Sequence, residues 1–268
     1  MTAILQTVFR HVLRSKMLVM LVVFSALVQY MGLWLLHSAT LSLSVKMEGM
    51  VKVMEAPSAI GMGIMIQLFL GMFIAIFYGA WMLPYLHKGD RAGLTFVLPV
   101  SRWVYPAVYA LVLLGLIALQ YTAIFASVGS HFGFGYFTAE GVSWSGVLLS
   151  FLIQFLAFAT VMFIVGISSL SIGPIATIFA SSGVIVVLMV GKAILLMSDA
   201  EGGGSSVFNG ILNVLPPIGD LVGDVIAAMD TQTVNWQRLA LWVGWLALVV
   251  VGLRIRIRMP VLKRSADG

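Results

Sequence analysis

The strongest constraint in this sequence is the recurrence of apolar stretches of about 20 residues, the length of helix that crosses a hydrocarbon layer about 30 Å thick. There are six such stretches, at residues 17–37, 60–83, 104–129, 146–167, 174–198 and 238–254. Of the 268 residues, 61% are hydrophobic and 9% charged, whereas about one quarter is charged in soluble domains. The sequence therefore predicts an all-α membrane protein with six transmembrane helices in one domain, residues 1–268, and excludes a water-soluble fold.

The charged residues are sorted by side of the membrane. If both termini are cytoplasmic, that side holds 11 of the 15 Lys and Arg residues: Arg10, Arg14, Lys16, Lys88, Arg91, Arg102, Arg254, Arg256, Arg258, Lys263 and Arg264. Eight of the ten acidic residues then lie outside: Glu48, Glu55, Glu140, Asp199, Glu201, Asp220, Asp224 and Asp230. Because positive charge stays on the cytoplasmic side, we expect an integral protein of a bacterial inner membrane with both termini in the cytoplasm. The net charge of +5 reflects this orientation and does not indicate nucleic-acid binding.

Residues 1–16 have the pattern of an amphipathic helix. Apolar side chains recur at helical spacing, while polar and basic ones such as Arg10 and Arg14 fall on the opposite face. An extension of the first span is the alternative, but it would place Arg10, Arg14 and Lys16 in hydrocarbon at considerable cost. We therefore expect a helix lying on the cytoplasmic leaflet.

The external segment 199–237 is apolar in two short stretches. Val207–Leu215 and Leu221–Met229 are each too short to span a membrane, and Pro216, Pro217 and Gly219 break the chain between them. This pattern predicts a re-entrant or surface-lying helical hairpin that caps the external end of the bundle, before the last span.

The cytoplasmic loop 85–103 has a charged beginning and an apolar end. Leu94, Val97 and Leu98 share one face of a short helix that Pro99 stops. Such an amphipathic helix suits a docking element, although an ordinary positively charged loop has the same composition. The candidate docking residues are His87, Lys88, Asp90, Arg91, Leu94, Val97, Leu98 and Arg102.

Polar residues inside the spans are candidates for a translocation pathway, since an unsatisfied polar group in hydrocarbon is costly. The first four spans each contain one glutamine, and the fifth contains a lysine: Gln29, Gln67, Gln120, Gln154 and Lys192. For the glutamines we favour hydrogen bonding between helices, and substrate contact is the alternative. Lys192 either meets an anionic group or extends its amine to the external surface.

The second span also has small residues at four-residue spacing, Gly71, Ala75 and Gly79. Such spacing lets another helix approach closely. We expect these residues to serve packing, either within the bundle or at a seam between two chains.

No catalytic or metal site is indicated. The chain has no cysteine, no Walker A loop, no HExxH pair and no GxSxG elbow. Its four histidines, His11, His37, His87 and His131, are scattered over different segments and both faces, which is typical of interface residues and not of a metal site.

The run Leu98-Pro99-Val100-Ser101-Arg102 after the second span, together with the amphipathic first helix, six spans and external hairpin, resembles the permease subunits of type 2 ABC exporters. This resemblance implies that the loop is a coupling helix, with Asp90 and Arg91 in polar contact with a separate cytoplasmic ATPase subunit. It also implies a second permease chain, identical or related, with ATP and Mg²⁺ bound in the ATPase and no cofactor in this chain.

Two other functional classes stay open. A non-transporting membrane scaffold or assembly factor uses the same bundle to hold partners, and an intramembrane enzyme requires a catalytic constellation that the sequence does not show. The substrate is not named by the sequence. The external loops are short, so a large periplasmic receptor would be another subunit, and membrane lipid is the expected surrounding of the bundle.

Overall fold

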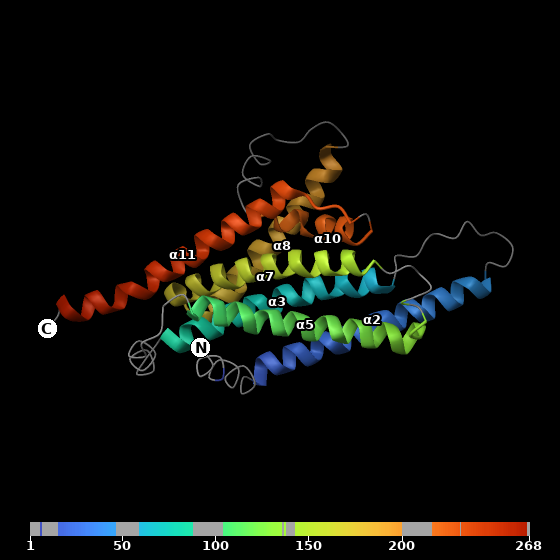
Figure 1. Cartoon of the computed structure of the whole chain (residues 1–268), viewed down its shortest axis with the longest axis horizontal. Helices are drawn as coiled ribbons and strands as arrows, with labels where there is room; N and C mark the ends of the chain where they lie inside the picture. Colours follow the sequence, from blue (N-terminus) through green and yellow to red (C-terminus); the bar gives the residue numbers. More distant parts are fainter. Residues whose placement is uncertain are drawn as a thin grey trace.

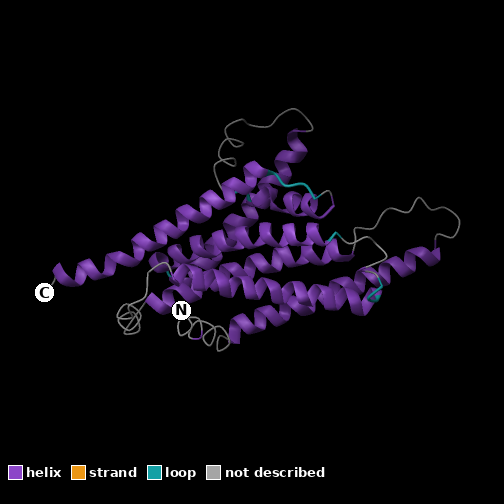
Figure 2. Ribbon diagram, viewed as in Figure 1, coloured by secondary structure: helices purple, strands orange, loops and turns teal. Residues whose placement is uncertain are grey.

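The chain forms a bundle of long helices (Figures 1 and 2). The computed structural model describes residues 6, 16–46, 59–87, 104–135, 137, 143–199, 216–230 and 232–266, and in these ranges it contains helices and no strand. The long helices are α2 (Lys16–Lys46), α3 (Ala59–His87), α5 (Val104–Phe132), α7 (Trp144–Ile172), α8 (Pro174–Asp199) and α11 (Trp236–Ala266). A 3₁₀ turn, η1 (Ile218–Asp220), and the short helix α10 (Leu221–Asp230) precede α11.

Five helices are long and apolar enough to cross a membrane. Their apolar stretches are Leu18–Ser38, Ala59–Trp81, Pro106–Phe132, Trp144–Ile172 and Trp236–Arg254. The ends of each stretch differ from the ends of a predicted span by at most five residues. Five of the six predicted spans are therefore confirmed as helices of spanning length. The remaining prediction, residues 174–198, falls on α8, whose described apolar stretch is Pro174–Leu188, shorter than the other five.

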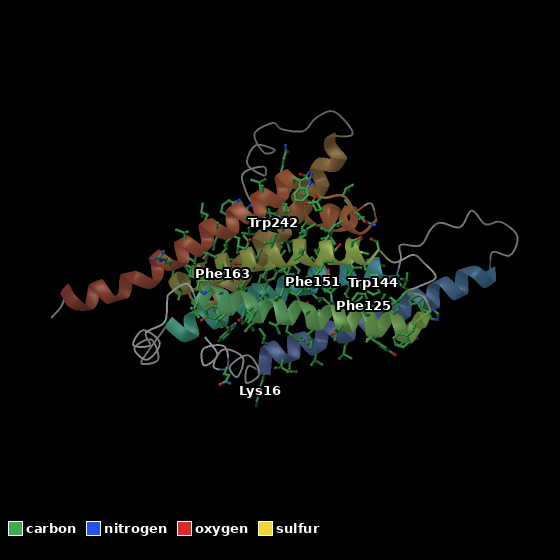
Figure 3. All side chains as sticks on the ribbon, viewed as in Figure 1. Lys16, Phe125, Trp144, Phe151, Phe163 and Trp242 are labelled. Atoms are coloured by element: carbon green, nitrogen blue, oxygen red, sulfur yellow. The ribbon has the colours of Figure 1, made fainter. Side chains whose placement is uncertain are left out.

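Successive long helices run in opposite directions. The starts of α2 and α5 lie at one end of the bundle, and the starts of α3, α7 and α11 lie at the other (Figure 1). Helix α7 is central and contacts α3, α5, α8, α10 and α11, while α2 packs against α3 and α5. Lys16, at the start of α2, lies at the opposite end from Trp144, at the start of α7 (Figure 3). This alternation is what a chain crossing a membrane repeatedly requires.

Helix α7 extends five residues beyond the predicted end at residue 167. Ser168 and Ser169 lie in this added part of the helix. Their hydroxyls donate to carbonyls of their own helix, those of Ile164 at 2.9 Å and Gly166 at 2.8 Å, so these polar groups are satisfied without breaking it.

A single residue, Gly173, separates α7 from α8. It has φ +90°, a conformation that favours glycine, and its N–H donates to the Ser169 carbonyl at 3.1 Å. Pro174 then starts α8, where its missing N–H costs no helical hydrogen bond. The two helices thus form a tight hairpin with a one-residue connection. The predicted spans left a connection of several residues, 168–173.

Helix α10 lies beside the first turns of α7. Leu221, Val225 and Ala228 form its buried face. Ser150 of α7 donates to the Val225 carbonyl at 3.2 Å, and a Cβ added to Gly146 would lie 2.7 Å from the Met229 carbonyl oxygen. Pro216 and Pro217 precede η1, and α10 falls on the second of the two predicted apolar stretches. The first stretch, Val207–Leu215, lies outside the described residues, so the re-entrant or surface-lying hairpin stays a prediction. The amphipathic helix predicted for residues 1–16 also lies outside them, apart from Gln6 and Lys16.

Candidate functional site

Four buried glutamines, one on each of α2, α3, α5 and α7, lie inside the bundle, and we call them the amide cluster. The side chains of Gln29, Gln67 and Gln154 are 0% exposed and that of Gln120 is 2% exposed. Gln67 Nε2 donates to Gln120 Oε1 at 3.2 Å, and Gln120 Nε2 donates to the Ser25 hydroxyl at 2.7 Å. This chain of hydrogen bonds links α3, α5 and α2, so for Gln67 and Gln120 the expected interhelical bonding is present.

The other amide groups of the cluster have no such partner. Among the described residues, neither amide atom of Gln29 or Gln154 is hydrogen-bonded, nor is the Oε1 atom of Gln67. A buried polar group without a partner costs about 1–3 kcal/mol. The summed cost of five such atoms would therefore equal a large fraction of a protein's net free energy of unfolding. The cluster therefore has hydrogen-bonding capacity that the chain itself does not satisfy.

Helices α3 and α7 meet at a seam of small residues. A Cβ added to Gly79 would lie 2.2 Å from the carbonyl oxygen of Met162, and one added to Gly71 would lie 2.4 Å from the Phe158 ring. Ala75, between them, is fully buried. The predicted packing role of these three residues is confirmed, and the seam lies within the bundle.

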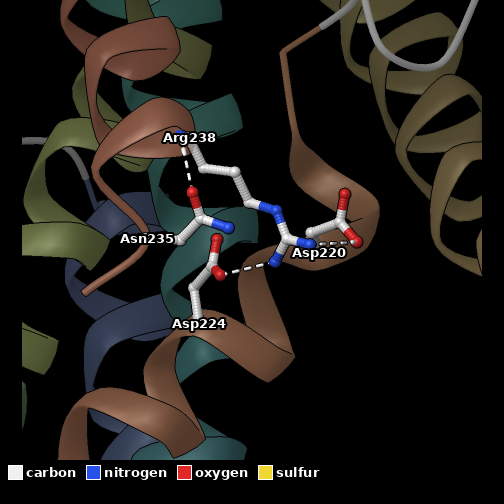
Figure 4. Close-up of polar contacts among 4 residues, drawn as sticks. All are labelled: Asp220, Asp224, Asn235 and Arg238. Carbon is white, nitrogen blue, oxygen red and sulfur yellow. Dashed lines mark hydrogen bonds and ion pairs between the residues drawn. The ribbon is translucent and has the colours of Figure 1, made fainter. Parts of the chain in front are cut away.

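Arg238, in the first turn of α11, joins two acidic residues of the preceding segment (Figure 4). Its Nη1 donates to Asp224 Oδ1 at 2.6 Å, and its Nη2 lies 3.6 Å from Asp220 Oδ1. The side chain of Asn235 caps α11 by accepting from the Arg238 N–H at 3.2 Å. This Arg238 clamp links η1 and α10 to the start of α11 through side-chain interactions.

The clamp sits at a partly buried position. The Asp224 side chain is 10% exposed and that of Arg238 is 36% exposed. Burial raises the pKa of Asp224 above its ordinary value, while the hydrogen bond and charge of Arg238 lower it and the charge of Asp220 raises it. Since burial is the largest of these effects, the pKa of Asp224 stays raised even with Arg238 beside it.

The clamp could not be predicted from the sequence, in which Asp220 and Asp224 stand out only as external charges and Arg238 only as the first residue of the last predicted span. The spacing did carry a signal, because Asp220 and Asp224 lie one helical turn apart in an otherwise apolar stretch. Ser25 was also missed. As a hydroxyl in the middle of the first apolar stretch, it was a candidate partner for any of the glutamines.

Two histidines that the sequence analysis described as scattered are neighbours. The rings of His37, in the second half of α2, and His131, in the last turn of α5, have centroids 6.4 Å apart, and the Tyr30 ring centroid lies 4.4 Å from that of His131. A second aromatic pair joins α5 and α7, where the Phe125 and Trp144 rings have centroids 5.5 Å apart (Figure 3). The described residues contain no group of three or more potential metal ligands.

Most of the predicted docking residues lie outside the described part of the chain. His87 ends α3, while Lys88, Asp90, Arg91, Leu94, Val97, Leu98 and Arg102 fall in residues 88–103, which the structure does not describe. Lys192 belongs to α8, but its side chain is likewise outside the described set. Their roles stay predictions.

A groove of about 150 Å³ lies between α3 and α8. Phe69, Phe73 and Ile76 line it from α3, and Ile185 and Val186 line it from α8, with Ser182 as its one hydroxyl side chain. Such a surface suits hydrocarbon and offers no group for acid–base or phosphate chemistry.

Comparisons with protein-family models, with curated proteins and with solved structures found no match to this chain.

Proposed function

We propose that this chain is the transmembrane subunit of an ATP-driven exporter of the type 2 ABC class. In this proposal it forms half of the substrate pathway and docks a cytoplasmic ATPase subunit through the loop between α3 and α5. A second permease chain forms the other half, and ATP and Mg²⁺ bind in the ATPase. The chain crosses a bacterial inner membrane six times, with α8 as the fifth span and both termini in the cytoplasm.

The observation that supports this proposal best is the mechanical connection from the loop to the centre of the bundle. Helix α3 leads directly into residues 88–103, and Gly79 lies eight residues, or about 12 Å, before its end at His87. At Gly79, α3 is in near backbone contact with Met162 of α7. A push on the loop would therefore move α3 and the central helix together.

The ends of the helices are consistent with this orientation. Lys16 starts α2 at the same end of the bundle at which α3 leads into the loop, and α11 also runs towards this end (Figures 1 and 3). The basic residues Arg256, Arg258, Lys263 and Arg264 are in the last turns of α11. Under the positive-inside rule this end is cytoplasmic, and η1 and α10 are then external.

In the proposed mechanism, ATP-driven closure of two ATPase subunits pushes on the two loops and rocks the two bundles between inward-open and outward-open packings, as rigid bodies. Because packed interfaces switch between discrete arrangements, the tight α3–α7 seam moves as a unit. The external segment held by the Arg238 clamp moves with α7 and α11. A periplasmic accessory protein, where one exists, is a separate subunit.

A membrane scaffold or assembly factor is the second candidate. The burial of all four glutamines inside one chain favours this candidate. A substrate pathway formed between two chains would reach these glutamines only after the helices had rearranged. The scaffold predicts no ATP-dependent movement of this chain. The two candidates therefore separate on that property.

Because the chain has no cysteine, one introduced cysteine can report on this movement. Gly223→Cys on α10 is suitable, since Gly223 is exposed and an added Cβ there meets no atom within 4 Å. In the complex with its ATPase, we expect Mg-ATP with vanadate to change the rate at which a water-soluble thiol reagent labels this cysteine. Asp90→Arg, Arg91→Glu and Leu94→Pro should each abolish the change.

Lys52→Glu, on the opposite side of the membrane, is the control and should leave the response intact. Membrane insertion of every variant is checked by its yield after solubilisation. If all three loop variants respond like the parent, residues 85–103 are not the coupling element. If the parent itself does not respond, the exporter proposal is contradicted and the scaffold is favoured.

A further inference from the structure

The buried amide cluster has more hydrogen-bonding groups than partners. Five amide atoms, both of Gln29, both of Gln154 and Oε1 of Gln67, have no hydrogen bond among the described residues. All three side chains are 0% exposed. Lipid cannot satisfy these groups, because acyl chains neither donate nor accept hydrogen bonds.

Gln29 lies at the same depth in the bundle as the bonded glutamines. It is one helical turn after Ser25, which bonds Gln120. Three residues further along α2, Gly32 approaches Ile66 of α3 so closely that an added Cβ would lie 2.8 Å from the Ile66 side chain. Ile66 directly precedes Gln67, so Gln29 is bracketed by two contacts of the same layer.

Gln154 reaches this layer from α7. The two contacts of the α3–α7 seam, Gly71 with Phe158 and Gly79 with Met162, show that the two helices run in the same direction. Gln67 lies one turn before Gly71, and Gln154 lies one turn before Phe158. The two glutamines therefore lie at matching heights. An added Cβ on Gly71 would lie 2.4 Å from the Phe158 ring and 3.2 Å from Gln67 Nε2, so the ring is next to the amide layer.

The chemistry of the layer selects its ligand. No Asp, Glu, Lys or Arg occurs in the apolar stretches of these four helices, so the layer has no charge to balance an ion. It offers unmatched donors, the Nε2 atoms of Gln29 and Gln154, together with unmatched acceptors, the three Oε1 atoms. A small neutral molecule that both donates and accepts is required.

We propose that the amide layer of α2, α3, α5 and α7 is an internal hydration site, in which enclosed water molecules bridge Gln29, Gln67 and Gln154. Enclosed waters make about three hydrogen bonds each, so two or three molecules satisfy the five free atoms. The four helices are then joined by a polar layer, linked directly through Ser25, Gln120 and Gln67 and through water elsewhere. Such a site belongs to this chain alone and does not depend on an ATPase partner.

Pulsed X-ray radiolysis tests the proposal, because hydroxyl radicals formed from enclosed water oxidise the side chains beside it. Phe158 is the reporter, and Phe163 is its matched control on the same helix, since the two rings are 0% and 1% exposed. In the unmodified chain in nanodiscs, we expect Phe158 to be oxidised on the order of tenfold faster than Phe163. Equal rates at the two rings would overturn the proposal.

A variant gives a second readout. Gln154→Leu removes two of the unmatched atoms at similar volume, so it should slow the oxidation of Phe158 several-fold while the rate at Phe163 stays the same. If Phe158 is oxidised at the parental rate in a folded Gln154→Leu chain, the water does not bind to this layer. The measurement on the unmodified chain decides the proposal even where the variant fails to fold.

Discussion

Replacing Gly79 by alanine is expected to lower the free energy of unfolding by about 3 kcal/mol, the upper end of the usual cost of overpacking a core. The added methyl would lie 2.2 Å from the Met162 carbonyl oxygen, and the two further close atoms, at 3.0 and 3.1 Å, also belong to backbone. Because a helix backbone cannot rotate aside as a flexible side chain can, α3 and α7 must separate. Thermal unfolding in detergent, followed by circular dichroism, measures the loss.

Gly115→Ala is the matched control. Gly115 also lies inside a helix, α5, but it is exposed and an added Cβ meets no atom within 4 Å. Since alanine is a better helix former than glycine, this variant should be neutral or more stable by up to about 1 kcal/mol. Equal effects of the two substitutions would show that α3 and α7 are not in backbone contact at Gly79.

Replacing Arg238 by methionine is expected to cost about 1–2 kcal/mol at neutral pH. Removing one partner of a buried ion pair costs about 3–5 kcal/mol, and we discount this figure because the Arg238 side chain is 36% exposed. The cost arises because the Asp224 side chain, which is 10% exposed, loses the hydrogen bond and the positive charge of Arg238. The first region to loosen should be α10, which amide hydrogen exchange detects.

The pH dependence of this effect has a definite sign. Burial already raises the pKa of Asp224, and loss of Arg238 removes the interactions that lower it, so the pKa rises further in the variant. The ion pair stabilises the fold only above the folded-state pKa of Asp224. The stability difference between parent and variant should therefore be largest at neutral pH and shrink as the pH falls through that pKa.

Gln237→Met tests the specificity of this result, since Gln237 is the exposed neighbour of Arg238 on α11. It should change stability little at any pH. In addition, Asp224→Asn combined with Arg238→Met should cost less than the sum of the two single changes, because the charge that Arg238 balances is then absent. An additive double variant with no pH dependence would contradict the clamp.

Five helices of spanning length could be predicted from the sequence, because hydrocarbon thickness sets the length of an apolar stretch. The side of the membrane on which each helix end lies stays a prediction from the positive charges. The end of α7 was predicted too early. Hydroxyls such as those of Ser168 and Ser169 return their hydrogen bonds to the helix, so they do not mark its end.

The contacts between helices were only partly predictable. Spacing showed that Gly71, Ala75 and Gly79 lie on one face, but a single helix does not reveal its partner, and α7 was found only in the structure. Gln67 and Gln120 are 53 residues apart, and His37 and His131 come from different hairpins, so nothing local in the sequence joins them. The Arg238 clamp depends in the same way on the turn between α10 and α11.

The central claim, that this chain docks an ATPase, is tested most directly by purifying it from its host in mild detergent and identifying the proteins that accompany it by mass spectrometry. The proposal predicts a stoichiometric partner with a Walker A sequence and ATPase activity, lost when Asp90 and Arg91 are charge-reversed together and retained with Lys52→Glu. Recovery of the chain without any such ATPase would contradict the exporter assignment and favour the scaffold.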